Sequence, residues 1–257
     1  TDNVIPVGLD KDGLSVKELE KSNADVAYLT PSHQYPLGIV MGIKRRVELL
    51  NWASRKEDRY IIEDDYDSEF RFSGMPVPSL MSADTAGRVV YINTFSKSIA
   101  PSVRVGYMVL PPALAARYRE EMGFYTCAAP ALEQYVVERF LTLGYYDRHI
   151  ARMKRACRAR RDRVIALIRK SAFADRVTIL EADAGLHFLL RVRTNESDAA
   201  LKWALRRVGV RVACLSDYAY PGTTADAHVL VINYSNVDVD ALEKSLPRVE
   251  QALLNGD

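Results

Sequence analysis

The sequence predicts an α/β protein in which a mostly parallel sheet flanked by helices is followed by a smaller C-terminal α+β domain. In the first half, short apolar runs that do not alternate with polar residues are separated by helical patterns, as in parallel sheets. A long helical pattern occupies the middle, and beyond Ser171 short apolar runs return. These observations predict three regions: a sheet domain over 1–125, connecting long helices over 126–170 and a small α+β domain over 171–257.

The first region carries the signals of an open sheet. Apolar residues at near-helical spacing predict a helix between 38 and 55, and the Pro- and Gly-rich stretch 73–79 predicts a loop. Because the apolar runs lack a polar face, we expect their strands to be buried on both faces. Strands are expected at four such runs: residues 26–29, 59–62, 89–92 and 105–110.

The remaining elements follow from proline, glycine and apolar spacing. Pro111 and Pro112 can begin a helix, because proline is tolerated in the first turn. The pattern from Ala131 to Lys170 is helical, and Gly144 is expected to divide it into two helices. Further strands are expected at 177–180, 186–190 and 229–232, and further helices at 197–208 and 239–254.

Composition excludes several classes of protein. The chain has 257 residues, 48% of them hydrophobic, and a formal net charge of +2, which excludes disordered and collagen-like architectures and gives no overall field for nucleic acid. No apolar run is long enough to span a bilayer, and residues 1–3 do not begin a signal peptide. The three dispersed cysteines indicate a reducing, cytoplasmic setting, and no metal-ligand spacing is present.

Polar side chains follow two of the expected strands. Asp64 and Tyr66 come directly after one apolar run, Lys97 follows another, and Arg104 precedes the next. Because ligands of open α/β sheets collect at the carboxyl ends of the strands, we expect these groups to form one site. Taken singly, each of them is more often a solvated loop residue.

The combined chemistry of these groups suits pyridoxal 5′-phosphate (PLP). A lysine amine can form a Schiff base with an aldehyde, and a carboxylate can keep a pyridine nitrogen protonated. A phenol can bond to the ring oxygen, and a guanidinium suits a phosphate. The hydroxyls of Thr94 and Ser96 can add phosphate contacts.

Four strings closely resemble the aminotransferase-like domain of MocR/GabR-type transcriptional regulators of the GntR superfamily: YLTPSHQYPLG, YIIEDDYDSEF, YINTFSKSIAPSVRVGYMVLP and GYYDRHIARMKRACRARRDR. The resemblance implies a partial PLP-dependent transferase fold of type I, with 1–125 as the C-terminal part of the large domain. It also implies that a winged-helix DNA-binding domain and the start of the large domain would precede Thr1. We therefore expect weaker cofactor binding than in an intact member.

By the same resemblance Lys97 is the Schiff-base lysine, Asp64 the partner of the pyridine nitrogen and Tyr66 the residue near the ring hydroxyl. Arg104, Thr94 and Ser96 would hold the phosphate. Tyr35, in Tyr35-Pro36, stands where aminotransferases of this fold usually have an asparagine that bonds the ring oxygen, and an aromatic there is typical of the regulators. A packing aromatic before a turn proline is the alternative.

A further departure concerns the substrate carboxylate. Aminotransferases grip it with an arginine near the C-terminus, whereas the matching stretch here has Val231, so we expect that clamp to be lost unless Arg211 or Arg193 replaces it. The arginine-rich segment 148–163 is interpreted as an amphipathic helix with a solvated basic face, in preference to a nucleic-acid surface. His187 is interpreted as a hydrogen-bonded core residue.

Three hypotheses for function follow. The first is an effector-sensing domain of a regulator, in which an amino acid or amine reacts at Lys97 and domain movement alters DNA binding by the absent N-terminal domain. The second is a working aminotransferase that transfers an amino group between an amino acid and a 2-oxo acid, and the third is an inactive scaffold. A homodimer is expected from the resemblance, and no membrane partner.

Overall fold

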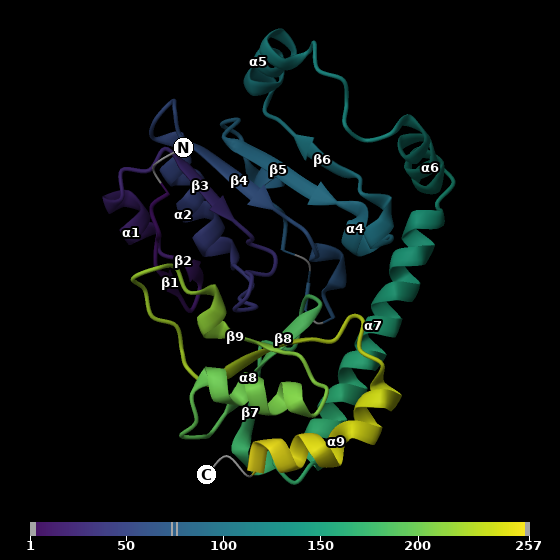
Figure 1. Ribbon diagram of the computed structural model, residues 1–257. Helices are drawn as coiled ribbons and strands as arrows, with labels where there is room; N and C mark the ends of the chain where they lie inside the picture. Colours follow the sequence, from purple (N-terminus) through teal and green to yellow (C-terminus); the bar gives the residue numbers. More distant parts are fainter. Residues whose placement is uncertain (1–3, 73, 76, 255–257) are drawn as a thin grey trace. The chain divides into compact units, whose positions relative to one another are not determined.

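The computed structural model describes residues 4–72, 74–75 and 77–254, which form two compact units (Figure 1). The first unit contains the described residues up to Tyr35, then Ile39–Glu69 and Gly74–Met153. The second contains Pro36–Gly38, residues 70–72 and the described residues from Lys154 onward. The expectations for residues 1–3, 73 and 76 concern positions outside the described residues.

The first unit is built on a four-stranded sheet that confirms the mostly parallel arrangement. Its strands are β3 (Val26–Leu29), β4 (Tyr60–Asp64), β5 (Val89–Thr94) and β6 (Gly106–Val109), in that spatial order. The first three strands run parallel, and β6 pairs antiparallel with β5. Because β3, β4 and β5 share a direction, their carboxyl ends lie at the same edge of the sheet.

Helix α2 covers one face of this sheet. It runs from Ile43 to Ser54, so residues 38–42, which were expected to be helical, belong to the preceding loop. Its Leu49 and Trp52 pack into a core with apolar residues of the strands. The other elements of this unit are β1 (Leu9–Asp10), β2 (Gly13–Leu14), α1 (Val16–Lys21), η1 (Ser68–Phe70), α3 (Leu80–Ala83), α4 (Phe95–Ser98), η2 (Pro101–Val103), α5 (Pro112–Met122) and α6 (Ala131–Thr142).

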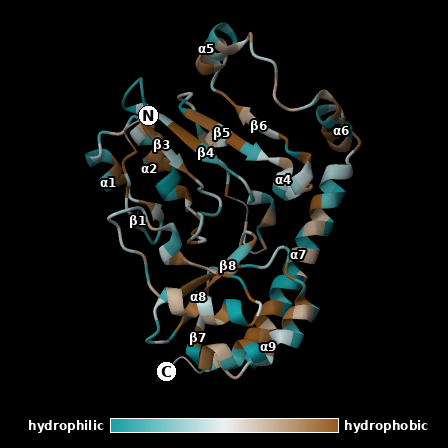
Figure 2. Cartoon of the chain, in the orientation of Figure 1, coloured by the Kyte–Doolittle hydropathy of each residue, from teal (hydrophilic) through white to brown (hydrophobic). Residues whose placement is uncertain are grey.

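The expectation that the strands are buried on both faces is wrong for β3 and β6. In β3, Ala27 and Leu29 are buried, whereas Val26 and Tyr28 are 50% and 61% exposed. Every residue of β6 is exposed. The apolar core with α2 lies on one face alone, so the side chains of β3 alternate between that core and solvent although nearly all of them are apolar. Figure 2 shows the hydrophobic character of these strands.

The second unit has an antiparallel sheet. Its order is β7 (Val177–Leu180), β8 (His187–Val192), β10 (Val229–Asn233) and β9 (Ala213–Cys214), which places the predicted strands of this region in one sheet. All three pairings are antiparallel. The predicted helices are also present, as α8 (Asp198–Arg207) and α9 (Val239–Leu254), together with η3 (Ala174–Arg176) and η4 (Leu215–Tyr218).

Helix α7 (Tyr145–Lys170) is continuous across the division between the units, which falls after Met153. Gly144 separates it from α6 and has a positive φ of 66°, a backbone conformation that glycine adopts without steric cost. The predicted division of the 131–170 segment at Gly144 is therefore confirmed. No helix among the described residues combines the length and apolarity needed to cross a membrane.

A buried ion pair connects α2 with the end of β4. Arg46 and Glu63 are 2% and 0% exposed, and Arg46 Nη1 lies 3.3 Å from Glu63 Oε1. The two carboxylate oxygens of Glu63 also accept hydrogen bonds from the backbone N–H groups of Leu80 and Met81, each at 2.9 Å. Burial raises the pKa of Glu63, against the opposing effects of these bonds and of Arg46. The pair thus joins α2, β4 and the start of α3.

Replacing Arg46 by methionine should destabilise the chain by about 3–5 kcal/mol, because it leaves a buried carboxylate without its cation. The loss relative to the parent chain should be larger at pH 8 than at pH 4, where Glu63 can take up a proton. Urea unfolding followed by circular dichroism measures both quantities. Arg117→Met is the matched control: Arg117 pairs with Glu121 on an exposed face, and its loss should leave the unfolding free energy unchanged. Equal effects of the two substitutions would contradict the role of the pair.

Candidate functional site

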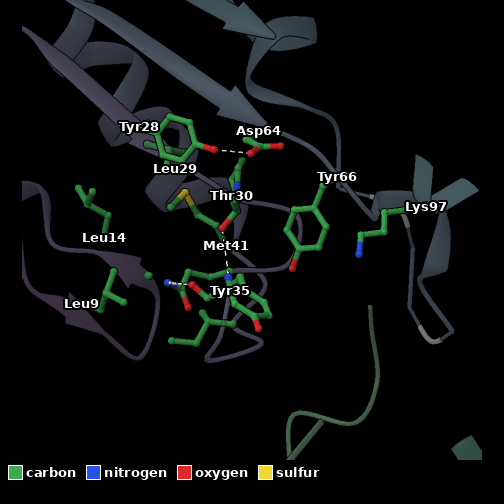
Figure 3. A pocket seen from close by; sticks show the side chains of 14 residues that line it. Leu9, Leu14, Tyr28, Leu29, Thr30, Tyr35, Met41, Asp64, Tyr66 and Lys97 are labelled. Atoms are coloured by element: carbon green, nitrogen blue, oxygen red, sulfur yellow. Dashed lines mark hydrogen bonds between the residues drawn. The ribbon is translucent and has the colours of Figure 1, made fainter. Parts of the chain in front are cut away.

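A cavity of about 470 Å³ lies at the carboxyl ends of β3 and β4, within the first unit (Figure 3). Four of the residues singled out in the sequence line it: Tyr35, Asp64, Tyr66 and Lys97. The walls are otherwise formed by strand ends and the loop before α2. They are contributed by Leu9, Gly13, Leu14, Tyr28, Leu29, Thr30, Pro31, Gln34, Ile39 and Met41.

Asp64 is the last residue of β4, and its carboxylate has a partner on the neighbouring strand. The Tyr28 hydroxyl donates a hydrogen bond to Asp64 Oδ2 (Figure 3). Burial, and then the bond to Asp64, raises the pKa of Tyr28 to about 12. The phenol therefore keeps its proton at neutral pH and continues to donate. Asp64 retains further acceptor capacity toward the cavity, because an ionised carboxylate has about four lone-pair positions.

Tyr66 is held by the loop that follows β3. Its hydroxyl donates to the backbone carbonyl of His33 at 3.0 Å. The His33 side chain is itself buried, with Nδ1 3.0 Å from Asp67 Oδ2. Burial is also the main cause that raises the pKa of Tyr66, and Asp67 adds to it. Tyr66 is thus a protonated phenol with a fixed orientation at the cavity wall.

Tyr35 lies at the edge of the cavity and remains 43% exposed. Its ring meets that of Tyr66 edge to face, with centroids 6.4 Å apart and an interplanar angle of 87°. Its backbone N–H donates to Thr30 Oγ1 at 3.2 Å. Tyr35 therefore borders the site and supports the ring of Tyr66.

Lys97 is carried by the short helix α4, which begins directly after β5. Thr94 caps this helix, since its Oγ1 accepts a hydrogen bond from Ser96 N–H at 3.2 Å. The Lys97 side chain lines the cavity, and Figure 3 shows its amine on the same side as Tyr66. Of the four groups expected to form one site, Lys97, Asp64 and Tyr66 line one cavity, and Arg104 is not among its lining residues.

Residues at the beginning of α7 contact both ends of α4. The Tyr146 ring meets that of Phe95 edge to face at 6.0 Å, and His149 Nε2 donates to the Ser98 carbonyl at 3.0 Å. The Tyr146 hydroxyl donates to Glu69 Oε1 at 3.0 Å. These contacts fix the helix that presents Lys97, because they engage both its first and its last residue.

The three predicted phosphate-binding residues are not among those that line the cavity. Thr94 Oγ1 donates to the Val105 carbonyl at 3.3 Å in addition to its capping role. Ser96 precedes Lys97 on α4, and Arg104 is an exposed residue with a left-handed backbone, φ 51° and ψ 29°, directly after η2. Their phosphate role stays a prediction.

The residues considered for the substrate carboxylate lie elsewhere. Val231 is buried in the core of the second unit beside Leu189, and the cavity has no arginine among its described lining residues. Arg193 donates to the Asp175 carbonyl at 2.8 Å. His187 is 3% exposed, and its Nε2 lies 2.9 Å from the Pro36 carbonyl oxygen, which confirms that it is a hydrogen-bonded core residue.

Tyr28, His33 and Asp67 were not predicted as site residues. Tyr28 alternates with buried Ala27 and Leu29 in β3, so the pleat placed its side chain on the other face, but the uninterrupted apolar run hid that alternation. The pairing of His33 with Asp67 joins residues 34 positions apart. Asp67 is one of several neighbouring acidic residues, and the sequence does not show which of them pairs with a distant histidine.

Comparison with known proteins identifies the family of this chain. The sequence model of the aminotransferase class I and II family matches residues 7–248. The probable rhizopine catabolism regulatory protein MocR of Rhizobium meliloti is 33% identical over 98% of this chain and 50% of its own length. The uncharacterized HTH-type transcriptional regulator YdeL of Bacillus subtilis is 36% identical over 86% of this chain and 48% of its own. The chain spans about half the length of these relatives.

Solved structures share the fold. Kynurenine aminotransferase of Pyrococcus horikoshii, in a complex with PMP, superimposes with a TM-score of 0.80 at 25% identity, over 98% of this chain and 63% of that one. The aminotransferase Aro9 of Candida albicans gives a TM-score of 0.84 at 19% identity, over 98% and 63%, and that likeness shows the fold alone. The predicted type I transferase fold is confirmed.

Glu69 supplies a test of the support beneath α4. Burial raises the pKa of Glu69, and Asp65 and Asp67 raise it further, while its Oε2 has no hydrogen-bond partner among the described residues. When folding raises the pKa of a carboxyl group, the folded protein becomes less stable as the pH rises past the ordinary pKa of that group, which is near 4.5. Glu69→Gln keeps an acceptor for Tyr146 without the charge, so the variant should gain stability over the parent as the pH rises from about 4.5 toward neutrality.

Urea midpoints measured across that pH range, with Glu121→Gln as the exposed control, test this prediction. The control should follow the parent chain at every pH. A Glu69→Gln variant whose advantage does not grow with pH would show that the carboxyl group is ionised without cost.

Proposed function

Because the chain belongs to the aminotransferase class I and II family, we propose that it is the PLP-dependent, effector-sensing domain of a MocR/GabR-type transcriptional regulator. One observation carries this proposal: an amine from α4, and a carboxylate and a protonated phenol from the end of β4 and the residues after it, line a single cavity at the strand ends. These are the groups that a pyridine aldehyde requires. The relatives that match nearly the whole chain, among them MocR, are named as regulators.

The side chains divide the binding work. Lys97 would supply the amine that bonds to the aldehyde, and Asp64 would accept a hydrogen bond from the protonated ring nitrogen. The Tyr66 hydroxyl, whose proton goes to the His33 carbonyl, would offer its oxygen as an acceptor to the ring hydroxyl. When bound, PLP supplies an electron sink for chemistry at an amine-bearing carbon. Tyr28 keeps Asp64 oriented by donating to one oxygen, which leaves the other for the ring nitrogen. Tyr35 closes the edge of the site.

The phosphate would lie near the start of α4, where Ser96, Thr94 and Arg104 follow β5. Thr94 presents its hydroxyl to the helix, so its contribution is to hold the first turn of α4 while Ser96 and Arg104 supply direct contacts. This assignment rests on the family resemblance. Because the described lining has no arginine for a substrate carboxylate, sensing of an amine is favoured over repeated transamination.

The wider role follows from the relatives' length. They are about twice as long as the matched region and are named as HTH-type or regulatory proteins, so we assign DNA binding by a winged helix to the remainder of such a protein. An amino acid or amine would be the effector, and a homodimer the working state. The cysteines are free in the described structure, which suits a cytoplasmic protein.

Lys97 should be the residue that PLP labels. Incubation of the chain with PLP, reduction with borohydride and peptide mass spectrometry should place the pyridoxyl group on Lys97, because its amine is the one beside Asp64 and Tyr66. Lys97→Ala should abolish this label, whereas Lys44→Ala, an exposed lysine of α2, should leave it unchanged. Asp64→Asn should weaken PLP binding about tenfold through the lost charge-assisted bond. Equal labelling of several lysines would contradict the assignment.

A second measurement separates sensor from enzyme. The PLP-loaded chain is mixed with a panel of amino acids and amines, and absorbance and 2-oxo acid are followed together. A spectral change with no more than one equivalent of 2-oxo acid per chain is expected of the sensor. Steady release of many equivalents would favour the aminotransferase alternative, and the absence of any response to PLP would favour an inactive scaffold.

A further inference from the structure

Helix α7 concentrates the positive charge of the protein. It carries eight arginines and two lysines against two aspartates, a net charge of +8, while the whole chain carries only +2. The rest of the chain is therefore net negative, with −6. Such asymmetry within one element creates a local field that the overall charge conceals.

Four of these arginines form an exposed row, the basic stripe, which consists of Arg148, Arg152, Arg155 and Arg158. At 100° per residue they fall within about 120° of the helix circumference, so they share one face. None of the four forms an ion pair with a described residue; Arg148 stacks on the Tyr145 ring with Cζ 4.8 Å from its centroid. By contrast, Arg161 pairs with Asp162, and Arg163 pairs with Asp240 and Glu243.

The opposite face of α7 anchors the helix. Cys157, Val164 and Ile168 are buried there, at 2%, 1% and 7% exposure. The stripe residues are separated on their own face by alanines, Ala151 and Ala159. Figure 2 shows hydrophilic and hydrophobic residues alternating along α7. The stripe is thus displayed on a helix fixed by its apolar side, with little bulk between the charges.

Although the sequence alone favours a solvated basic face for segment 148–163, we infer that the basic stripe of α7 binds the phosphate backbone of duplex DNA. All four arginines lie on one continuous helix, so their spacing is that of the helix itself. From Arg148 to Arg158 the axial distance is about 15 Å, the length of about four phosphate steps of one strand at about 3.4 Å each along the duplex axis. Guanidinium groups suit phosphate oxygens in geometry as well as in charge.

The composition of the stripe favours duplex DNA over other anionic surfaces. A membrane-binding helix needs large apolar residues beside its basic ones to insert among lipids, and here the large aliphatic residues of α7 are buried or partly buried in the protein. Single-stranded nucleic acid needs aromatic rings for stacking, and only Tyr145, already covered by Arg148, lies at one end of the stripe. A row of cations that has neither large exposed apolar residues nor stacking rings can contact the phosphates of DNA, but it cannot distinguish one base sequence from another.

The inference goes beyond the proposed function, which assigns DNA binding to another segment, and it does not depend on PLP. In a regulator the stripe would add a sequence-independent contact to the specific one. A failure to bind PLP would therefore leave this inference standing, and a failure to bind DNA would leave the sensing site standing.

The test uses the chain itself with a fluorescein-labelled mixed-sequence DNA duplex of about 30 base pairs, and follows anisotropy from about 50 to 200 mM salt. Four phosphate contacts predict a slope of log K against log salt of about −3.6. Arg152→Gln with Arg155→Gln should reduce that slope by about 1.8 and weaken binding at 50 mM salt about tenfold or more. Arg148→Gln with Arg158→Gln should act in the same way.

Arg206→Gln with Arg207→Gln on α8 removes the same charge elsewhere and should change neither slope nor affinity. Thermal unfolding of each variant checks that the fold is intact. No binding at about 100 µM protein and 50 mM salt, or equal loss in the control, would overturn the inference. Polyglutamate that competes as well as DNA at equal charge would also overturn it, in favour of an acidic protein partner.

Discussion

The buried pair of Arg46 and Glu63 is the constraint on which the geometry of the site depends. The guanidinium of Arg46 also donates to the backbone carbonyls of Pro31 and Met41, at 3.0 and 3.1 Å, which are the two ends of the loop that lines the cavity. Glu63 is adjacent to Asp64 in β4. One ion pair therefore sets both the loop that carries Tyr35 and the strand end that carries Asp64. Buried pairs contribute little net stability, so its value here lies in defining one arrangement.

Further polar contacts fix the orientation of the functional groups that line the cavity. Tyr28 orients Asp64, and the carbonyl of His33 orients Tyr66, while His33 itself is held by Asp67. Each of these groups is partly or fully removed from water, where an unmet hydrogen bond costs about 1–3 kcal/mol. Alternative orientations of the Asp64 carboxylate and of the Tyr66 hydroxyl are therefore disfavoured. The site is preorganised before any ligand enters it.

Much of this arrangement could be predicted from the sequence, and the reasons for the rest are physical. Asp64, Tyr66 and Lys97 were predicted together because parallel strands end at one edge of a sheet, which is a property of topology. Tyr28 and His33 act through partners more than thirty residues away, and residue type alone does not identify such pairs. The run Val26–Leu29 predicted burial on both faces, whereas only one face has a core in the described structure. Composition records that a side chain is apolar, and it does not record what covers it.

Catalysis and effector sensing require different amounts of binding free energy from the cavity. Enzymatic acceleration commonly needs about 8 kcal/mol or more of transition-state stabilisation, much of it from exact placement of the substrate. Coupling between an effector site and a second site needs only about 1–3 kcal/mol of differential binding. In the proposed sensor, an amine that engages the site in place of Lys97 would release a side chain of α4, which contacts Tyr146 and His149 at the start of α7. The described lining offers a ligand a carboxylate, an amine and phenols, so the proposed sensing role asks less of this site than catalysis would.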